Sequence, residues 1–367
     1  MACARARARA RALRSRHRSS RRQMLASAGT DVSLWEIGRD EPLQQLQEHG
    51  APVSSLRWTS NDRVLGSASH DGSILLIESD GNMFDTLRPV PNEPSVAVPV
   101  LSLSWSPGSR YLAAGCNDAT VRVFDLQRRV QALQLRGHRA GVGAVAWNPN
   151  ELHVASASSA GEIVMHRVQG SVAAVSRATH PKLEEDTLPP AVSCLQWAPF
   201  EPTKLACAAE DGQVSLWDME VEAQASSPST CFAEHADSCS GLAWSLISHH
   251  VLASCSEDST ALLYDTKIGS VVRRFNADVA LTALAFAADG VHLACVTPAP
   301  ALGRPRPSSA RSMILGVVTW PGTDSAQSMG RSCSTTCAHP SRRRSGPSRR
   351  TTSLSPRLPS NVPPRGR

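Results

Sequence analysis

Histidine, aspartate and cysteine side chains recur along this sequence, and these residue types could hold a metal ion or transfer protons. Three possible ligands lie close together in the sequence at Cys333, Cys337 and His339 (C-x3-C-x-H), and a second group is Cys231, His235 and Cys239. A structural zinc site wants four ligands at suitable spacing, and each group offers three. We therefore predict no metal site and no cofactor.

The sequence also lacks the patterns that carry catalysis. It contains no G-x-S-x-G elbow, no P-loop and no H-E-x-x-H motif. Catalysis by scattered His and carboxylate groups would need them to converge on one place, and no such set is visible in the sequence. We predict no catalytic residues and no enzyme activity. The Asp-Gly pairs at 71–72, 211–212 and 289–290 instead fit turns between strands.

The elements that position these residues come from a repeat. Six segments (VSSLRW, LSLSW, VGAVAW, VSCLQW, SGLAW and LTALAF) end at an aromatic residue, with spacings of 47, 42, 50, 47 and 42 residues: Trp58, Trp105, Trp147, Trp197, Trp244 and Phe286. A second ladder runs in step: Trp35, Ile77, Phe124, His166, Trp217 and Tyr264. A period of roughly 40–45 residues with a WD-type dipeptide is typical of WD40 blades, which are four-stranded antiparallel sheets.

The repeat predicts where strands lie and where the pattern fails. Each full unit has an alternating first strand and then a small-residue second strand (VLGSAS, YLAAGC, HVASAS, KLACAA or VLASCS). Residues 23–37 hold a second and a third strand of a first blade with no evident first strand. After Cys295 we expect no third strand in the last unit. The sequence thus predicts an all-β WD40-type propeller on a seven-blade plan, incompletely closed.

Charge divides the chain into three parts. Residues 1–22 carry nine Arg and no acid; residues 23–300 carry 17 Lys and Arg against 31 Asp and Glu; residues 301–367 carry 12 Arg and one acid, Asp324. We predict a disordered Arg-rich extension over 1–22, the propeller over 23–296 and a disordered Arg, Pro and Ser-rich tail over 297–367. An acidic body would repel phosphate, so nucleic-acid binding by the folded part is not expected.

The ten cysteines and the hydropathy pattern bear on the compartment. Cys116, Cys207, Cys255 and Cys295 lie in predicted second strands, where free Cys behaves as a small buried hydrophobe. No Cys spacing suggests disulfides, which indicates a reducing compartment, cytosol or nucleus. No apolar run approaches the ~20 residues needed to cross a bilayer, so no membrane association is predicted.

Particular phrases resemble one family of WD40 proteins. AGEIVMH (160–166), VSLWDM (214–219), LLYDTKIGSVVRRF (262–275) and ADVALTALAFAADGVHLA (277–294) are similar to the propeller of GCP-WD, the gamma-tubulin ring complex recruitment family. The resemblance covers roughly residues 23–295. It implies an N-terminal propeller that targets centrosomes and spindles. Nothing here resembles the C-terminal helical segment with which that family grips gamma-tubulin.

The WD40 resemblance also implies a role for the regularly placed polar residues. A His before the first strand, a turn Asp and a third-strand Trp form a buried hydrogen-bonded network in such blades, which must be satisfied to be tolerated. The matching positions are His49, His138 and His235, and Asp71, Asp118, Asp211 and Asp258. Val96, Leu188 and Ala277 replace the His elsewhere, and Gly29 and Ala160 replace the Asp. We expect no copy to hold all three members.

Two functions of different class follow. The first is a non-catalytic scaffold that helps localise microtubule nucleation at centrosomes and spindle poles, in the cytoplasm and cytoskeleton, with the gamma-tubulin ring complex and centrosomal proteins as partners by resemblance. The alternative is an RNA- or chromatin-associated adaptor whose basic ends, including Arg342–Arg344, bind phosphate. Steep salt-dependent nucleic-acid binding that vanished on deletion of 301–367 would favour the alternative.

Overall fold

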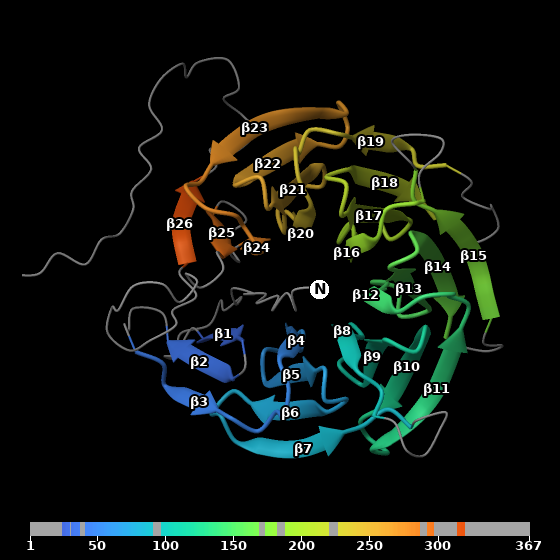
Figure 1. Cartoon of the computed structure of the whole chain (residues 1–367), viewed down its shortest axis with the longest axis vertical. Coiled ribbons are helices and arrows are strands. Elements are labelled where there is room, and N and C mark those ends of the chain that lie inside the picture. The colour runs from blue at the N-terminus through green and yellow to red at the C-terminus, as the bar shows by residue number, and fades with distance from the viewer. Residues whose placement is uncertain are drawn as a thin grey trace, which may run out of the picture. The chain divides into compact units, whose positions relative to one another are not determined.

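The computed structural model describes residues 24–29, 31–36, 41–90, 97–168, 173–181, 188–219, 227–286, 292–296 and 314–319. All the strands belong to the first of two compact units, Met1–Thr336, and only this unit is treated below. Its described residues form antiparallel sheets, which we number blades 1 to 7 in chain order. Figure 1 shows the blades following one another around a common centre.

The strands of each blade follow one another in sequence and in the sheet. Blade 1 comprises β1 (Met24–Ala28), β2 (Val32–Glu36) and β3 (Gln44–Leu46). Blade 2 comprises β4 (Val53–Trp58), β5 (Val64–Ser69), β6 (Ile74–Glu78) and β7 (Met83–Leu87). Blade 3 comprises β8 (Val100–Trp105), β9 (Tyr111–Cys116), β10 (Thr120–Asp125) and β11 (Val130–Arg136). Blade 4 comprises β12 (Val142–Trp147), β13 (His153–Ser158), β14 (Glu162–Arg167) and β15 (Ala173–Thr179).

The last three blades repeat the plan. Blade 5 comprises β16 (Val192–Trp197), β17 (Lys204–Ala209), β18 (Val214–Asp218) and β19 (Thr230–Phe232). Blade 6 comprises β20 (Cys239–Trp244), β21 (Val251–Ser256), β22 (Thr260–Asp265) and β23 (Ser270–Asn276). Blade 7 comprises β24 (Ala283–Phe286), β25 (His292–Val296) and β26 (Ile314–Thr319). The all-β WD40-type fold predicted from the aromatic ladders is confirmed.

The hydrophobic core lies between blades rather than within one central mass. One cluster of buried residues joins each pair of consecutive blades, from the pair of blades 1 and 2 to the pair of blades 6 and 7. In the cluster between blades 4 and 5, for example, Ile163 and Met165 pack with Trp197 and Trp217. A blade with a neighbour on each side therefore has both faces of its sheet buried.

The ring is not closed by the same kind of contact. Among the described residues no hydrophobic cluster joins blade 7 to blade 1, and these two blades lack the packing seen at the other junctions. Each of them also has three described strands where the other five have four. This agrees with the predicted incomplete closure.

Two details at the ends differ from the sequence-based expectation or extend it. Blade 7 has a third strand, β26, which pairs with β25 and which we did not expect. It lies beyond residue 296, the predicted end of the propeller. Blade 1 does hold the expected second and third strands, β1 and β2, and β3 adds an outer strand. The predicted disordered segments 1–22 and 297–367, β26 apart, lie outside the described residues and stay predictions.

Candidate functional site

The polar side chains that could do chemistry are used inside the blades, and blade 6 shows this most fully. Nδ1 of His235 lies 3.1 Å from a carboxylate oxygen of Asp258 and 2.9 Å from the hydroxyl of Thr260. Its Nε2 lies 2.6 Å from the hydroxyl of Ser254, which is 2.9 Å from the hydroxyl of Tyr264. Tyr264 is fully buried on β22. A tyrosine hydroxyl therefore takes the place of a tryptophan N–H in this network.

Blade 5 corrects the expectation that no copy holds all three members. His180, which follows β15, lies with Nε2 3.0 Å from the hydroxyl of Ser215, and the indole of Trp217 donates to that hydroxyl at 2.9 Å. Asp211 is close enough to His180 to act on its pKa. The blade therefore contains all three residue types: the His and the Trp are joined through Ser215, and the nearby Asp211 is hydrogen-bonded to Gln213. We had assigned the His position to Leu188, which is exposed instead.

In blades 2 to 4, other side chains take some of the positions of the network. In blade 2, His49 bonds the hydroxyls of Ser73 and Ser67 at 2.9 and 2.8 Å, and its Nδ1 lies 3.5 Å from Asp71. In blade 4, Nδ1 of His138 lies 3.6 Å from Glu162, which supplies the carboxylate missing at Ala160.

In blade 3 the fully buried Arg122 bonds the turn carboxylate of Asp118 and donates to the backbone carbonyl of Val90. Position 96, where this blade would carry its His, lies outside the described residues. A fixed guanidinium thus replaces the imidazole as partner of the turn carboxylate.

Burial sets the protonation of these histidines. It lowers the pKa of His49, His180 and His235 below the usual value, because a charged imidazole is costly to desolvate, although nearby carboxylates partly offset this. For Asp258 burial alone would raise the pKa, but hydrogen bonds from Thr260 and from the backbone of Ala236 outweigh it and lower the pKa. Neutral histidine with ionised aspartate is the state that satisfies each network near pH 7.

The cysteines are packing residues. Cys116, Cys207, Cys255 and Cys295 are buried on second strands, as predicted, and none is in a disulfide. Burial raises the pKa of Cys116 and Cys295 to about 12 and that of the other two well above its usual value, so all four are poor nucleophiles.

Neither candidate zinc group gains support. Within the described ranges no three His, Cys, Asp or Glu side chains cluster as a metal site would require. Of Cys231, His235 and Cys239, the first is exposed, the second belongs to the blade 6 network and the third is buried. Cys333, Cys337 and His339 lie outside the part that the structure describes. The described segments also hold no helix long and apolar enough to cross a membrane.

Two hollows on the surface could receive a partner. The first, of about 410 Å³, lies where the inner strands of blades 2 to 7 end, and the six ladder aromatics line it together with Pro107, Pro149 and Pro199. These aromatics are nine-tenths or more buried, and the charged residue in the lining is Arg57, whose Nε donates to the backbone carbonyl of Leu103 at 3.2 Å.

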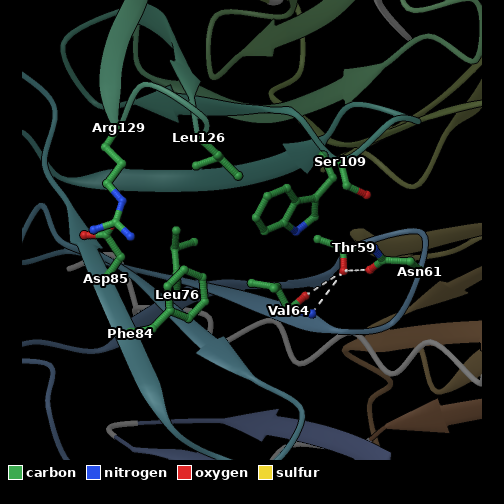
Figure 2. Close-up of a pocket in the computed structure, with 10 residues that line it drawn as sticks. Thr59, Asn61, Val64, Leu76, Phe84, Asp85, Ser109, Leu126 and Arg129 are labelled. Carbon is green, nitrogen blue, oxygen red and sulfur yellow. Dashed lines mark hydrogen bonds and ion pairs between the residues drawn. The ribbon is translucent and has the colours of Figure 1, made fainter.

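The second hollow, of about 160 Å³, lies between blades 2 and 3 and is drawn in Figure 2. Val64, Leu76 and Leu126 provide an apolar lining, and the half-exposed ring of Phe84 stands at its side. At the rim, the guanidinium of Arg129 lies 3.6 Å from the carboxylate of Asp85. We call this the blade 2–3 pocket.

A comparison with family models matches the repeats directly. The model described as "WD domain, G-beta repeat" matches residues 40–78, 95–125, 129–165, 184–218 and 226–265, each ending at or near the third strand of a blade. The chain is a WD40-repeat protein. Strands β1 and β2 of blade 1 and the whole of blade 7 fall outside these matches, and these are the two blades with only three described strands.

Among curated relatives, this WD40 protein is similar to NEDD1. It is 28% identical to human "Protein NEDD1" over 273 residues, covering 73% of this chain and 39% of that protein, and the cow protein gives 29% over the same length. The "Anaphase-promoting complex subunit cdc20" of Dictyostelium discoideum is 29% identical over 172 residues, 46% of this chain and 32% of that protein. The chain thus spans about two fifths of the NEDD1 proteins that it matches.

A solved structure supports the fold alone. The "Crystal Structure of Mitotic Checkpoint Complex" contains a chain with a TM-score of 0.58 and 20% identity, covering 68% of this chain and 71% of that one. The chain described here is a WD40-repeat protein that is similar to NEDD1, and its ring of blades is incompletely closed among the described residues.

Proposed function

We propose that this chain is a non-catalytic scaffold that presents its blades to protein partners at centrosomes and spindle poles and helps localise microtubule nucleation. The observation that carries the proposal is the similarity to NEDD1 over 73% of the chain, together with the phrases of 262–294 that resemble the gamma-tubulin ring complex recruitment family. By that resemblance the partners are the gamma-tubulin ring complex and centrosomal or spindle proteins.

The chemistry of the blades supports a scaffold over an enzyme. In the described part, the imidazoles of His49, His180 and His235 are buried and bonded to hydroxyls of their own blades. Groups used in this way hold strands together and are not free to meet a substrate. What remains for a partner is shape, apolar contact and rim charge, which are the features that protein recognition uses.

The blade 2–3 pocket is the described surface that we assign to partner contact. Phe84, with 43% of its surface exposed, can bury further apolar area when a partner side chain enters. The rim pair of Asp85 and Arg129 offers one charge of each sign to orient it. An aromatic beside a small apolar hollow is the kind of contact that dominates interface energetics.

Localisation in dividing cells tests the proposal. The tagged chain is expected to concentrate at spindle poles. Phe84→Asp should reduce that signal several-fold, whereas Ile268→Asp, on an exposed turn of blade 6 away from the pocket, should leave it unchanged. An even distribution of the unaltered chain would contradict the proposed function. Equal signals from the two variants would contradict only the assignment of the pocket.

A further inference from the structure

Tryptophans at the ends of inner strands link consecutive blades. In three blades the indole Nε1 donates to a carbonyl on the inner strand of the preceding blade, always that of the residue just before its aromatic. The bonds run from Trp105 to Arg57 at 2.8 Å, from Trp197 to Ala146 at 3.1 Å and from Trp244 to Gln196 at 3.1 Å. In blade 4, Trp147 bonds Glu151 of its own turn instead, at 3.4 Å.

Trp58 also departs from this rule. Its Nε1 is buried and has no hydrogen-bond acceptor among the described residues, while the side chain as a whole is only 4% exposed. A buried donor without an acceptor costs about 1–3 kcal/mol, so native structures rarely leave one. By analogy with Trp105, the acceptor of Trp58 would be a carbonyl on an inner strand of blade 1.

Among the described strands, blade 1 has no inner strand that corresponds to β4 of blade 2. Its β1 corresponds to the second strand of the other blades: Leu25 pairs with Trp35 in β2 as Leu65 pairs with Ile77 in blade 2. In blade 2 the first strand β4 pairs with the edge of β5 that does not pair with β6, and Trp58 lies opposite Leu65. Blade 1 has no such neighbour of β1 among the described strands, although β1 packs beside β4 (Figure 1).

The resident inner strands define what would fit. Their first and fourth residues are buried and apolar, apart from a cysteine at the first position in blade 6, and the sixth is aromatic. The second residue is skipped by the strand pairing, which is a β-bulge. Where this second residue is Ser, its hydroxyl donates to a backbone carbonyl of the next blade, at the position five residues before that blade's aromatic: Ser54 to Val100, Ser193 to Cys239 and Ser240 to Leu281.

We propose that the free edge of β1 is a binding site for an extended segment of a partner protein, which adds as the inner strand of blade 1. The segment would run antiparallel to β1 and carry the pattern apolar–Ser–x–apolar–x–aromatic. Its fifth carbonyl would accept the N–H of Trp58, and its Ser would donate to the carbonyl of Val53. Strand addition to a sheet edge is a known mode of peptide recognition, with the backbone giving affinity and alternate side chains giving specificity.

The two ends of this sequence do not fit the site. Trp58 stands seven positions before its partner Leu65 in the sequence. The same spacing in blade 1 would place Arg18 opposite Leu25, at the aromatic sixth position of the pattern, and Arg16 at its buried fourth position. An arginine there would be desolvated with no counter-ion supplied by the pattern. Residues 321–367 contain no Phe, Trp or Tyr. Neither of these two segments carries the required pattern, and the occupant that we propose is a segment of a partner protein.

A peptide taken from this protein provides the probe. The peptide AVSALQWA copies residues 191–198 with Cys194 changed to Ala and carries fluorescein at one end. We expect saturable binding to the full chain, and we expect the amides of Met24–Ala28 to become protected from hydrogen exchange. A scrambled peptide of the same composition should not bind. Loss of one hydrogen bond in Trp58→Phe should weaken binding about three- to tenfold.

The matched control is Trp244→Phe. It also removes one indole hydrogen bond, but that bond goes to the carbonyl of Gln196 in blade 5 and not to the proposed binding site. This variant should bind the peptide as the unaltered chain does, and thermal unfolding checks that both variants fold. Equal binding of scrambled and ordered peptides, or absence of saturation, would overturn the proposal. Protection, without peptide, of the Met24–Ala28 amides that face away from β2 would overturn it too, because the free edge of β1 would then already be filled by the chain itself.

Discussion

Coupling between His235 and Tyr264 through Ser254 is the most specific energetic consequence of the blade 6 network. Tyr264→Phe removes one hydroxyl, and Ser254 keeps its bond to His235, so the loss should be about 1 kcal/mol of unfolding free energy. His235→Leu removes bonds to Ser254, Thr260 and Asp258 and should cost about 3 kcal/mol at about 1 kcal/mol per bond.

The double variant should be destabilised by more than the sum. With both partners gone, the buried hydroxyl of Ser254 loses both of these bonds, which adds about 1 kcal/mol. Urea unfolding of the four proteins measures this interaction energy. The matched control pairs Tyr264→Phe with His49→Leu in blade 2, which shares no partner with it and should add within about 0.5 kcal/mol. Additivity in the blade 6 pair would refute the network.

Three further outcomes are expected. His180→Leu should lower the unfolding free energy by about 2 kcal/mol, whereas Leu188→Ala, at the exposed position, should change it by less than about 0.5 kcal/mol; equal effects in urea unfolding would contradict the assignment of His180. Because folding lowers the pKa of the network histidines, the unfolded state binds more protons below about pH 6.5, so stability is retained above that pH and lost as pH falls further. Melting temperatures from pH 7.5 to 5.5 should show this fall, less steeply in His235→Leu, and a flat profile would contradict it. In the native chain a thiol reagent followed by mass spectrometry should label Cys231 well before Cys207, and equal rates would contradict the burial of Cys207.

The repeated aromatics allowed most strands to be predicted, because burial of an inner strand between two blades restricts its residue types. The second strands expected from VLGSAS, HVASAS and VLASCS are β5, β13 and β21 with the same bounds. The turns at Asp71-Gly72 and Asp211-Gly212 were predictable because glycine adopts a positive φ at little cost, and the pair at 289–290 lies outside the described residues. Gly212 adopts φ +84°, and a Cβ there would lie 2.7 Å from the carbonyl oxygen of His235.

The networks were less predictable because hydrogen bonds depend on position in space and not on sequence spacing. His180 stands 17 residues before Trp197, whereas the expected position, Leu188, stands nine residues before it, and yet Nε2 of His180 lies 3.0 Å from the hydroxyl of Ser215. Glu162 supplies a carboxylate from two residues beyond the expected position because its side chain is longer. The fixed spacing could not reveal either one. β26 was missed because a long segment separates it from β25.

An experimental structure of the chain at side-chain resolution tests the central claim most directly, namely that successive sheets join through their inner strands around one axis. It should show the indole of Trp197 bonded to the carbonyl of Ala146, between blades 4 and 5. It should also show the indole of Trp244 bonded to the carbonyl of Gln196, between blades 5 and 6. It should also show no closing hydrophobic cluster between blades 7 and 1. Sheets in separate lobes, with those indoles bonded within their own sheets, would contradict the account.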